Sequence, residues 1–111
     1  MARENALGQF EFIVLLALLR LGDEAYGMPI AQAIEETTGR DVVLSSVYFA
    51  LERLQKKGMI SSTLGEPTAE RGGRAKRYFR VTARGLREVR DTRRTLTKLW
   101  RRLPQLAEDG I

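Results

Sequence analysis

The stretch Arg71–Gly85, RGGRAKRYFRVTARG, decides the fold of this chain. In its second half, Lys76–Thr82, polar and apolar side chains alternate and strand-forming residues are frequent, which predicts a β-strand. The adjacent Gly72 and Gly73 permit a sharp turn before that strand. Thr82 stands where a threonine can cap the helix that follows. The stretch therefore predicts a basic loop, the returning strand of a hairpin and the start of a helix.

The partner strand of this hairpin is expected just upstream. MISSTL, Met59–Leu64, has the composition of a short strand. Residues 65–75 contain the turn, because Pro67 and the two glycines fall within them. These segments together predict a two-stranded hairpin with a positively charged tip.

Two helices are predicted in the first forty residues. Leu7–Leu21 is apolar on most faces, so it reads as a helix that is buried on most sides. The second helix runs from about Met28 to Thr38. Pro29 is tolerated in its first turn, and Gly39 is placed to end it.

A third helix precedes the hairpin. Its expected N-cap is Ser45 or Ser46, and Gly58 is expected to end it. Its apolar positions recur at spacings of four and three, which predicts one buried stripe made of Val47, Leu51 and Leu54.

A long last helix is predicted from Ala83 to about Leu103. Its inward positions recur at spacings of three and four, as in a helix–helix seam, and are Leu86, Val89, Arg93, Leu96, Trp100 and Leu103. This seam has only the first helix or a second copy of the chain to pack on. We therefore expect a homodimer built by the last helix and by Leu7–Leu21, with an amphipathic helix packed inside one chain as the alternative.

The order helix, helix, helix, hairpin, helix is typical of a winged helix-turn-helix. We expect a mainly α (α+β) fold with a two-stranded wing and a long C-terminal dimerisation helix. Residues 1–82 are then the DNA-binding domain, and residues 83–111 are the dimerisation helix and tail.

The composition excludes several classes of function. The 111 residues include no cysteine and no histidine, which removes disulfides, thiol nucleophiles and the commonest general base and metal ligand. We therefore expect no enzyme, no cofactor and no metal. The longest apolar run, Phe12–Leu19, is too short to cross a bilayer and lacks the flanks of a signal peptide. The sequence thus favours a cytoplasmic protein without a membrane partner.

The charge is distributed unevenly. The chain carries a net charge of +5, but its first forty residues are acidic and its second half is basic. Such asymmetry favours a polyanionic partner, with nucleic acid as the first candidate, although a generically basic protein has the same composition.

The third helix and the hairpin tip hold the candidate DNA contacts. A recognition helix uses its outer face on base edges and phosphates, and a basic wing adds phosphate or minor-groove contacts. The base-edge candidates are Ser46, Phe49 and Arg53. The phosphate candidates on the helix are Ser45, Tyr48 and Lys56, and those on the wing are Arg71, Arg74, Lys76 and Arg77. Capping by Ser45, helix packing by the two rings and simple solvation of the wing are the alternatives.

Three segments together resemble the PadR family of bacterial regulators, in its short form. They are YGMPIAQAI, SSVYFALERLQKKGMISS and RAKRYFRVTARG, and the resemblance covers about residues 7–103. It implies a winged-helix dimer that binds a pseudo-palindromic operator in double-stranded DNA and leaves it when a small molecule binds. By position, the family's motif tyrosines match Tyr26, Tyr48 and Tyr78. Phe49 stands where the family often has proline.

Trp100, the single tryptophan, is placed like the residue that stacks on flat aromatic compounds in the multidrug-binding branch of that family. The resemblance thus suggests Trp100 and its neighbour Leu96 as contacts for a small hydrophobic or aromatic effector. Filling the dimer interface is the simpler interpretation of both residues.

The sequence leads to a dimeric, sequence-specific transcriptional regulator, with repression as the expected mode. The alternative is a winged-helix protein-interaction module without sequence-specific DNA binding, because winged helices also serve as protein scaffolds.

Overall fold

The computed structural model describes residues 7–66 and 75–106 of the chain. In that part of the chain the elements follow in the order α1 (Gln9–Leu21), η2 (Gly22–Glu24), α2 (Gly27–Thr38), α3 (Leu44–Lys56), β1 (Ile60–Leu64), β2 (Arg77–Val81), α4 (Ala83–Trp100) and η4 (Pro104–Leu106). The elements η2 and η4 are single turns of 3-10 helix. None of the described helices combines the length and the apolar character that crossing a membrane requires.

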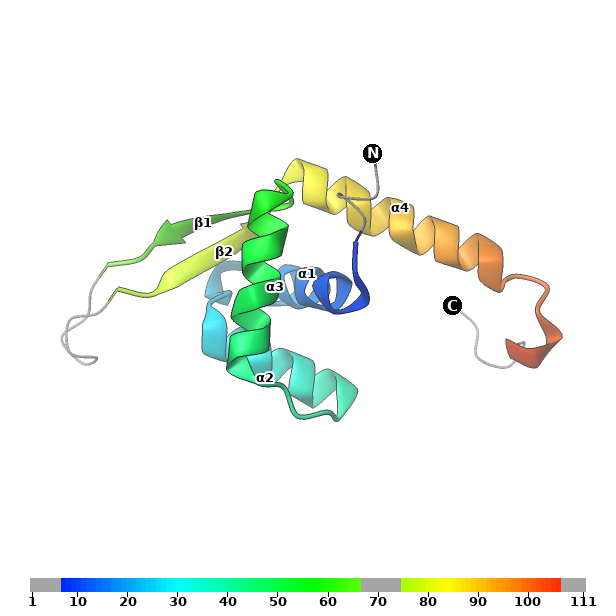
Figure 1. Ribbon diagram of the computed structural model, residues 1–111, viewed down its shortest axis with the longest axis horizontal. Coiled ribbons are helices and arrows are strands. Elements are labelled where there is room, and N and C mark those ends of the chain that lie inside the picture. The colour runs from blue at the N-terminus through cyan, green and yellow to red at the C-terminus, as the bar shows by residue number, and fades with distance from the viewer. Residues whose placement is uncertain (1–6, 67–74, 107–111) are drawn as a thin grey trace.

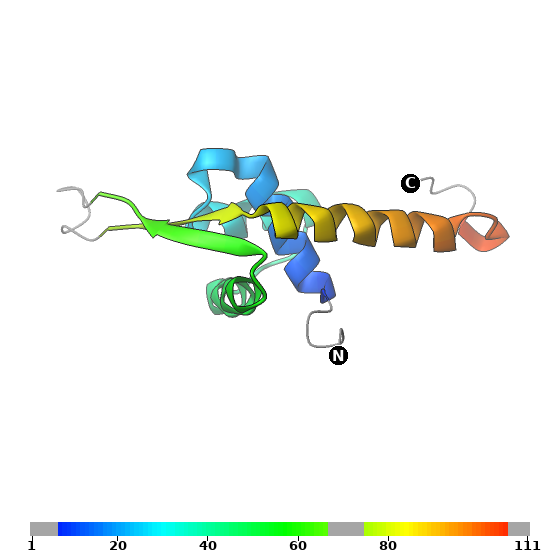
Figure 2. The same ribbon diagram turned by 90° about the horizontal axis from the view of Figure 1, so that it is seen from above.

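The helices α1, α2 and α3 form the body of the molecule, and the hairpin and α4 extend from it in opposite directions (Figure 1). Seen from above, the hairpin and α4 lie along one line, and α3 is viewed end-on at one side of that line (Figure 2). This is the winged helix-turn-helix that the sequence predicts, with α2 and α3 as the helix pair and β1 and β2 as the wing.

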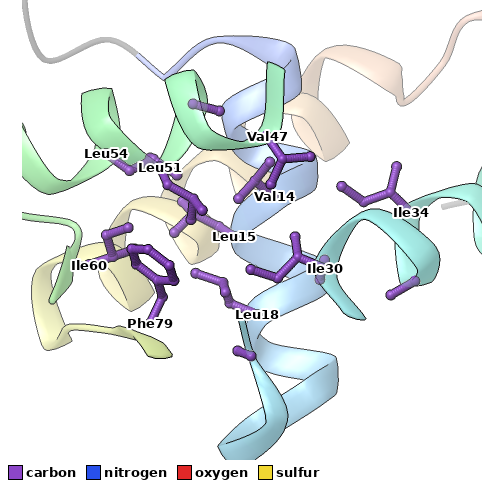
Figure 3. Packing of buried hydrophobic residues seen from close by; sticks show 14 of the residues in the cluster. Val14, Leu15, Leu18, Ile30, Ile34, Val47, Leu51, Leu54, Ile60 and Phe79 are labelled. Atoms are coloured by element: carbon purple, nitrogen blue, oxygen red, sulfur yellow. The ribbon is translucent and has the colours of Figure 1, made fainter. Parts of the chain in front are cut away.

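The core lies where the three helices meet the base of the wing (Figure 3). Its buried side chains include Val14, Leu15, Leu18, Ile30, Ile34, Val47, Leu51, Leu54, Ile60 and Phe79. The inward stripe predicted for the third helix is confirmed, because Val47, Leu51 and Leu54 are at most 1% exposed. Burying each such side chain stabilises the fold by about 1.5–3 kcal/mol, so this stripe fixes which face of α3 remains outside.

The wing is an antiparallel pair in which Ile60 is opposite Val81 and Leu64 is opposite Arg77. At the base of the wing, the Phe79 N–H donates to the Ala25 carbonyl oxygen over 2.9 Å. This bond attaches β2 to the turn that leads into α2. The hairpin is thus held by the body at its base.

The junction between the wing and α4 is tightly closed around Thr82. Its hydroxyl donates to the Gly58 carbonyl oxygen at 2.7 Å and accepts from the Gly85 N–H at 3.1 Å. The predicted cap of the last helix is therefore confirmed. A Cβ atom at Gly85 would overlap the Met59 carbonyl oxygen, so the first turn of α4 lies directly against the backbone that leaves α3.

Two expectations about helix starts are wrong. The first helix begins at Gln9, with Gly8 as its N-cap, and not at Leu7. The third helix has Val43 as its N-cap, without a side-chain cap bond, so neither Ser45 nor Ser46 caps it. Leu44 packs against the core, and we attribute the earlier start to this apolar contact.

The last helix ends at Trp100, so the prediction that it reaches Leu103 is wrong. Arg102 has a φ of 64°, which breaks the helical backbone. Pro104 follows two residues later and disfavours a helical conformation for Leu103. Leu103 therefore lies outside α4 and does not continue its seam.

Candidate nucleic-acid interface

The outer face of α3 is defined by one line of exposed residues, namely Ser45, Phe49, Glu52 and Lys56. Their spacing of four, three and four follows a helix of about 3.6 residues per turn. On such a helix the line runs opposite the buried stripe described above. We call these four residues the outer line of α3. A partner that docks on α3 meets them first.

The flank of α3 that faces the wing is joined to it through Ser62. The Ser62 hydroxyl lies 3.2 Å from Nε2 of Gln55 in α3 and 3.1 Å from Nη1 of Arg77 in β2. The Gln55 amide and the Arg77 guanidinium both donate to this one oxygen. The predicted wing contact Arg77 is therefore exposed and set beside the C-terminal half of α3.

Tyr48 lies on the same flank, nearer the start of α3. A Cβ atom at Gly27 would overlap the Tyr48 hydroxyl, so the ring packs on the first residue of α2. Tyr48 nevertheless remains 47% exposed. Its position allows both roles considered for it, helix packing and contact with a ligand on the outer face.

The opposite flank of α3 is fixed by a buried carboxylate. Glu11 of α1 is 5% exposed. Its Oε2 accepts from Nε of Arg53 at 2.7 Å, and its Oε1 accepts from Nζ of Lys57 at 2.6 Å and from the Gly8 N–H at 3.0 Å. The predicted base contact Arg53 is thus anchored to α1 through Nε, while half of its side chain remains exposed.

These contacts determine the charge of Glu11. Burial alone raises the pKa of the Glu11 carboxyl. The hydrogen bonds from Lys57, Gly8 and Arg53, together with the positive charge of Lys57, outweigh burial and hold the pKa below its ordinary value. Glu11 is therefore ionised at neutral pH and ties the end of α3 to the start of α1.

An open groove runs along this flank. It has a volume of about 410 Å³ and is lined by Phe10, residues 41–43, Ser46, Phe49 and Arg53. Two phenyl rings and the exposed Val43 make much of its wall apolar. All three base-edge candidates of α3 border this groove, and of these only Phe49 belongs to the outer line.

Lys76, a predicted phosphate contact, lies just before β2, on the tip side of the described wing, and is held there by Tyr26. Its Nζ lies 3.2 Å from the Tyr26 hydroxyl and 4.3 Å from the centre of that ring. Tyr26 in turn meets Tyr78 edge to face, with 5.3 Å between the ring centres. Lys76 therefore sits in an aromatic cluster that also positions β2. The other two predicted wing contacts, Arg71 and Arg74, lie outside the described residues.

The seam predicted for the last helix divides into two parts. Val89, near the body, is buried, and Leu86 is partly buried. Farther along, Leu96 is 45% exposed and Leu99 is 68% exposed, and Leu103 beyond the helix is also exposed. The distal half of α4 thus presents apolar side chains that the described body does not cover.

Arg93 and Trp100 differ from the other seam positions. Arg93 lines a basic hollow of about 290 Å³ with Arg94, Lys98 and Arg101. The Trp100 indole N–H is buried, and no acceptor for it lies among residues 7–66 and 75–106. A buried donor that stays unpaired costs about 1–3 kcal/mol, so an acceptor atom placed beside this N–H would be stabilising.

Sequence reasoning missed Glu11, Tyr26 and Ser62 as organisers of this surface. Glu11 was apparent only as a polar residue in an apolar helix, and its partners follow 42 and 46 positions later. For Glu11, that isolated carboxylate was the one available signal.

In residues 7–66 and 75–106, no three acidic, histidine or cysteine side chains come together as metal ligands.

Comparisons with known proteins agree with this geometry. The model of the family described as "Transcriptional regulator PadR-like family" matches residues 15–91. A transcriptional regulator from Clostridium thermocellum is similar in structure, with a TM-score of 0.66, 27% identity and coverage of 86% of this chain and 85% of that one. No curated protein matches the chain.

Two further solved structures show the same likeness. A PadR-like transcription factor from Bacteroides fragilis gives a TM-score of 0.69 at 25% identity, covering 87% of this chain and 85% of the other. A PadR family transcriptional regulator from Eggerthella lenta gives 0.65 at 24% identity, covering 78% and 73%.

Proposed function

The chain belongs to the PadR-like family of transcriptional regulators, and from this premise we propose that it is a homodimeric repressor. In this proposal the dimer binds a pseudo-palindromic operator in double-stranded DNA and leaves it when a small-molecule effector binds. A winged-helix regulator, rather than an enzyme, is what the family and the similar structures indicate. Because its target is chromosomal DNA, we expect the protein in the cytoplasm.

The observation that carries the DNA-binding proposal is the outer face of α3 together with the wing joined to it through Ser62. A protruding helix enters the major groove, and a basic wing beside it reaches phosphates or the next minor groove. The proposed contacts on α3 are Ser45, Ser46, Tyr48, Phe49, Arg53 and Lys56, and those on the wing are Arg71, Arg74, Lys76 and Arg77.

Dimerisation is supported by the distal half of α4. Leu96 and Leu99 are exposed on a helix that extends away from the body (Figure 1). Packing these side chains against a second copy removes their apolar surface from water. We therefore assign residues 1–82 to DNA binding and residues 83–111 to dimerisation.

Effector binding is supported by Trp100 and Leu96. An indole N–H that is buried without an acceptor, beside exposed apolar surface, suits a flat aromatic compound that carries an acceptor atom. An effector that prefers the non-binding arrangement of the two α3 helices shifts the population away from the operator.

The direct test is binding of the purified protein to a labelled fragment from upstream of its own gene, with unrelated DNA as competitor, at several salt concentrations. We expect competitor-resistant binding that weakens steeply with salt, by a log–log slope of roughly −0.9 per neutralised phosphate. Equal and weak binding to every fragment would contradict a sequence-specific operator at this position. No binding even at low salt would favour the protein-interaction module instead.

A further inference from the structure

Glu52 occupies an unusual place for a carboxylate on a surface that faces DNA. It belongs to the outer line of α3, between Phe49 and Lys56, and its side chain is 62% exposed. Its position opposite the buried stripe places it at the centre of the face that would enter the major groove. A negative charge at this point repels phosphates, so phosphate binding alone gives no reason for it.

The local ion pair does not neutralise Glu52. Its Oε2 lies 4.0 Å from Nζ of Lys56, whose side chain is 77% exposed. Such an exposed pair is screened by water and salt and is readily separated. Glu11 differs in each respect, because it is buried and bound by two cations within 2.7 Å. Of these two carboxylates beside α3, Glu52 is the one free to meet a ligand.

The major groove offers hydrogen-bond donors of a kind that a carboxylate can accept. Cytosine presents its N4 amino group, and adenine presents its N6 amino group beside the N7 acceptor. The N7 lone pair repels a carboxylate, whereas cytosine has no acceptor next to its amino group on this edge. Phe49, one turn earlier on the outer line and 59% exposed, suits the methyl group of a thymine.

We propose that Glu52 determines sequence specificity by accepting a hydrogen bond from the N4 amino group of a cytosine in each half-site. This assignment rests on the proposed DNA-binding function and adds the base that is read. Glu52 lowers the affinity for DNA in general because it repels phosphates. It raises discrimination because only a correctly placed cytosine compensates for that repulsion.

The experiment uses the full chain and a pool of short duplexes with a randomised core. The duplexes retained by the wild-type protein and by the variants Glu52→Ala and Glu52→Gln are sequenced. Glu36→Ala, which removes an exposed carboxylate from α2, is the charge-matched control for Glu52→Ala. Thermal melting of each variant reports folding, which an exposed substitution leaves intact.

The wild type should enrich one cytosine at a fixed position of each half-site. Glu52→Ala should lose that preference while the other positions keep theirs, and should bind random duplexes a few-fold more tightly. Glu52→Gln should move the preference toward adenine, because an amide both donates and accepts. Replacing the cytosine with thymine should weaken wild-type binding by roughly tenfold or more and leave Glu52→Ala unchanged.

Three results would overturn the proposal. If Glu52→Ala selects the same bases at every position as the wild type, Glu52 reads no base, and sequence-specific binding itself still holds. If Glu36→Ala alters base preference as Glu52→Ala does, the effect is one of net charge only. A wild-type protein that enriches no sequence would contradict the proposed function, and this assignment would fall with it.

Discussion

Gly27 and Tyr48 are packed so closely that a Cβ atom at residue 27 would take the place of the tyrosine hydroxyl. The contact joins the first residue of α2 to the side of α3 that faces the wing. It therefore helps set the angle between the two helices of the helix-turn-helix. The atoms in the way belong to the outer end of a half-exposed side chain, which can move.

Replacing Gly27 with alanine should therefore change binding more than stability. Displacement of the ring should cost less than about 1 kcal/mol of unfolding free energy, since a surface side chain relocates easily. In a Tyr48→Ala background the same Gly27→Ala change should stabilise the protein, because alanine favours a helix by up to about 1 kcal/mol over glycine. Urea unfolding of the four proteins measures this coupling, and additive effects would contradict the contact.

Replacing Gly85 with alanine should lower the stability, unlike the same change at Gly27. The atoms that a Cβ would overlap there include the Met59 carbonyl oxygen, which is backbone and cannot rotate away. Gly85→Ala should lower the unfolding free energy by about 1–3 kcal/mol through overpacking of the junction. Thr95→Ala, at an exposed site of α4, is the control and should change little. Equal melting temperatures for the two variants would contradict the tight junction.

The Glu11 cluster predicts a specific pH dependence of stability. Its pKa is lower in the folded state than in the unfolded chain, so its contribution is present at neutral pH and is lost as the pH falls. Glu11→Gln should cost roughly 1–3 kcal/mol at pH 7, because Lys57 and Arg53 lose their ionic partner. The difference from wild type should shrink below about pH 4.3, where unfolded glutamate becomes protonated.

Denaturant unfolding of both proteins across this pH range measures that difference. Glu36→Gln is a suitable control, because Glu36 is exposed on α2 and outside the cluster. A wild-type advantage that stays constant down to acidic pH would show that shape, and not charge, explains the effect of the Glu11 substitution.

The dimer proposal predicts that Leu96→Asp separates the protomers. A charge at an exposed seam position cannot be buried against a second copy without a large desolvation cost. Arg94→Asp introduces an acidic side chain on the side of α4 opposite Leu96 and should leave the dimer intact. Light scattering after size-exclusion chromatography, over a range of concentrations, distinguishes the two. A monomeric wild type, or a dimeric Leu96→Asp protein, would contradict the proposal.

Local patterns in the sequence were sufficient for the elements and much of the core. The spacing of Val47, Leu51 and Leu54 is a property of one helix, and the cap at Thr82 depends on Gly85 three residues later. Both could be predicted because neither needs a distant partner. The start of α3 could not, because packing of Leu44 on the core outweighed the capping preference of the two serines.

The candidate interface was predicted less completely, for the same reason. The sequence indicated which face of α3 is exposed, but not that Arg53 is bound to Glu11 or that Lys76 is bound to Tyr26. Those pairs join residues 42 and 50 positions apart, and single-sequence patterns carry no information on such distances. Whether the predicted residues contact DNA stays a prediction.

In the proposed dimer, the exposed leucines of α4 would link regulation to the number of copies in the cell. If the protomers pair as proposed, burial of Leu96 and Leu99 stabilises the dimer, and the population of operator-competent molecules then rises faster than the amount of protein made. At low expression the operator would remain empty even without an inducer. Dilution at cell division would then lower the occupancy of the operator, as binding of a small-molecule effector does.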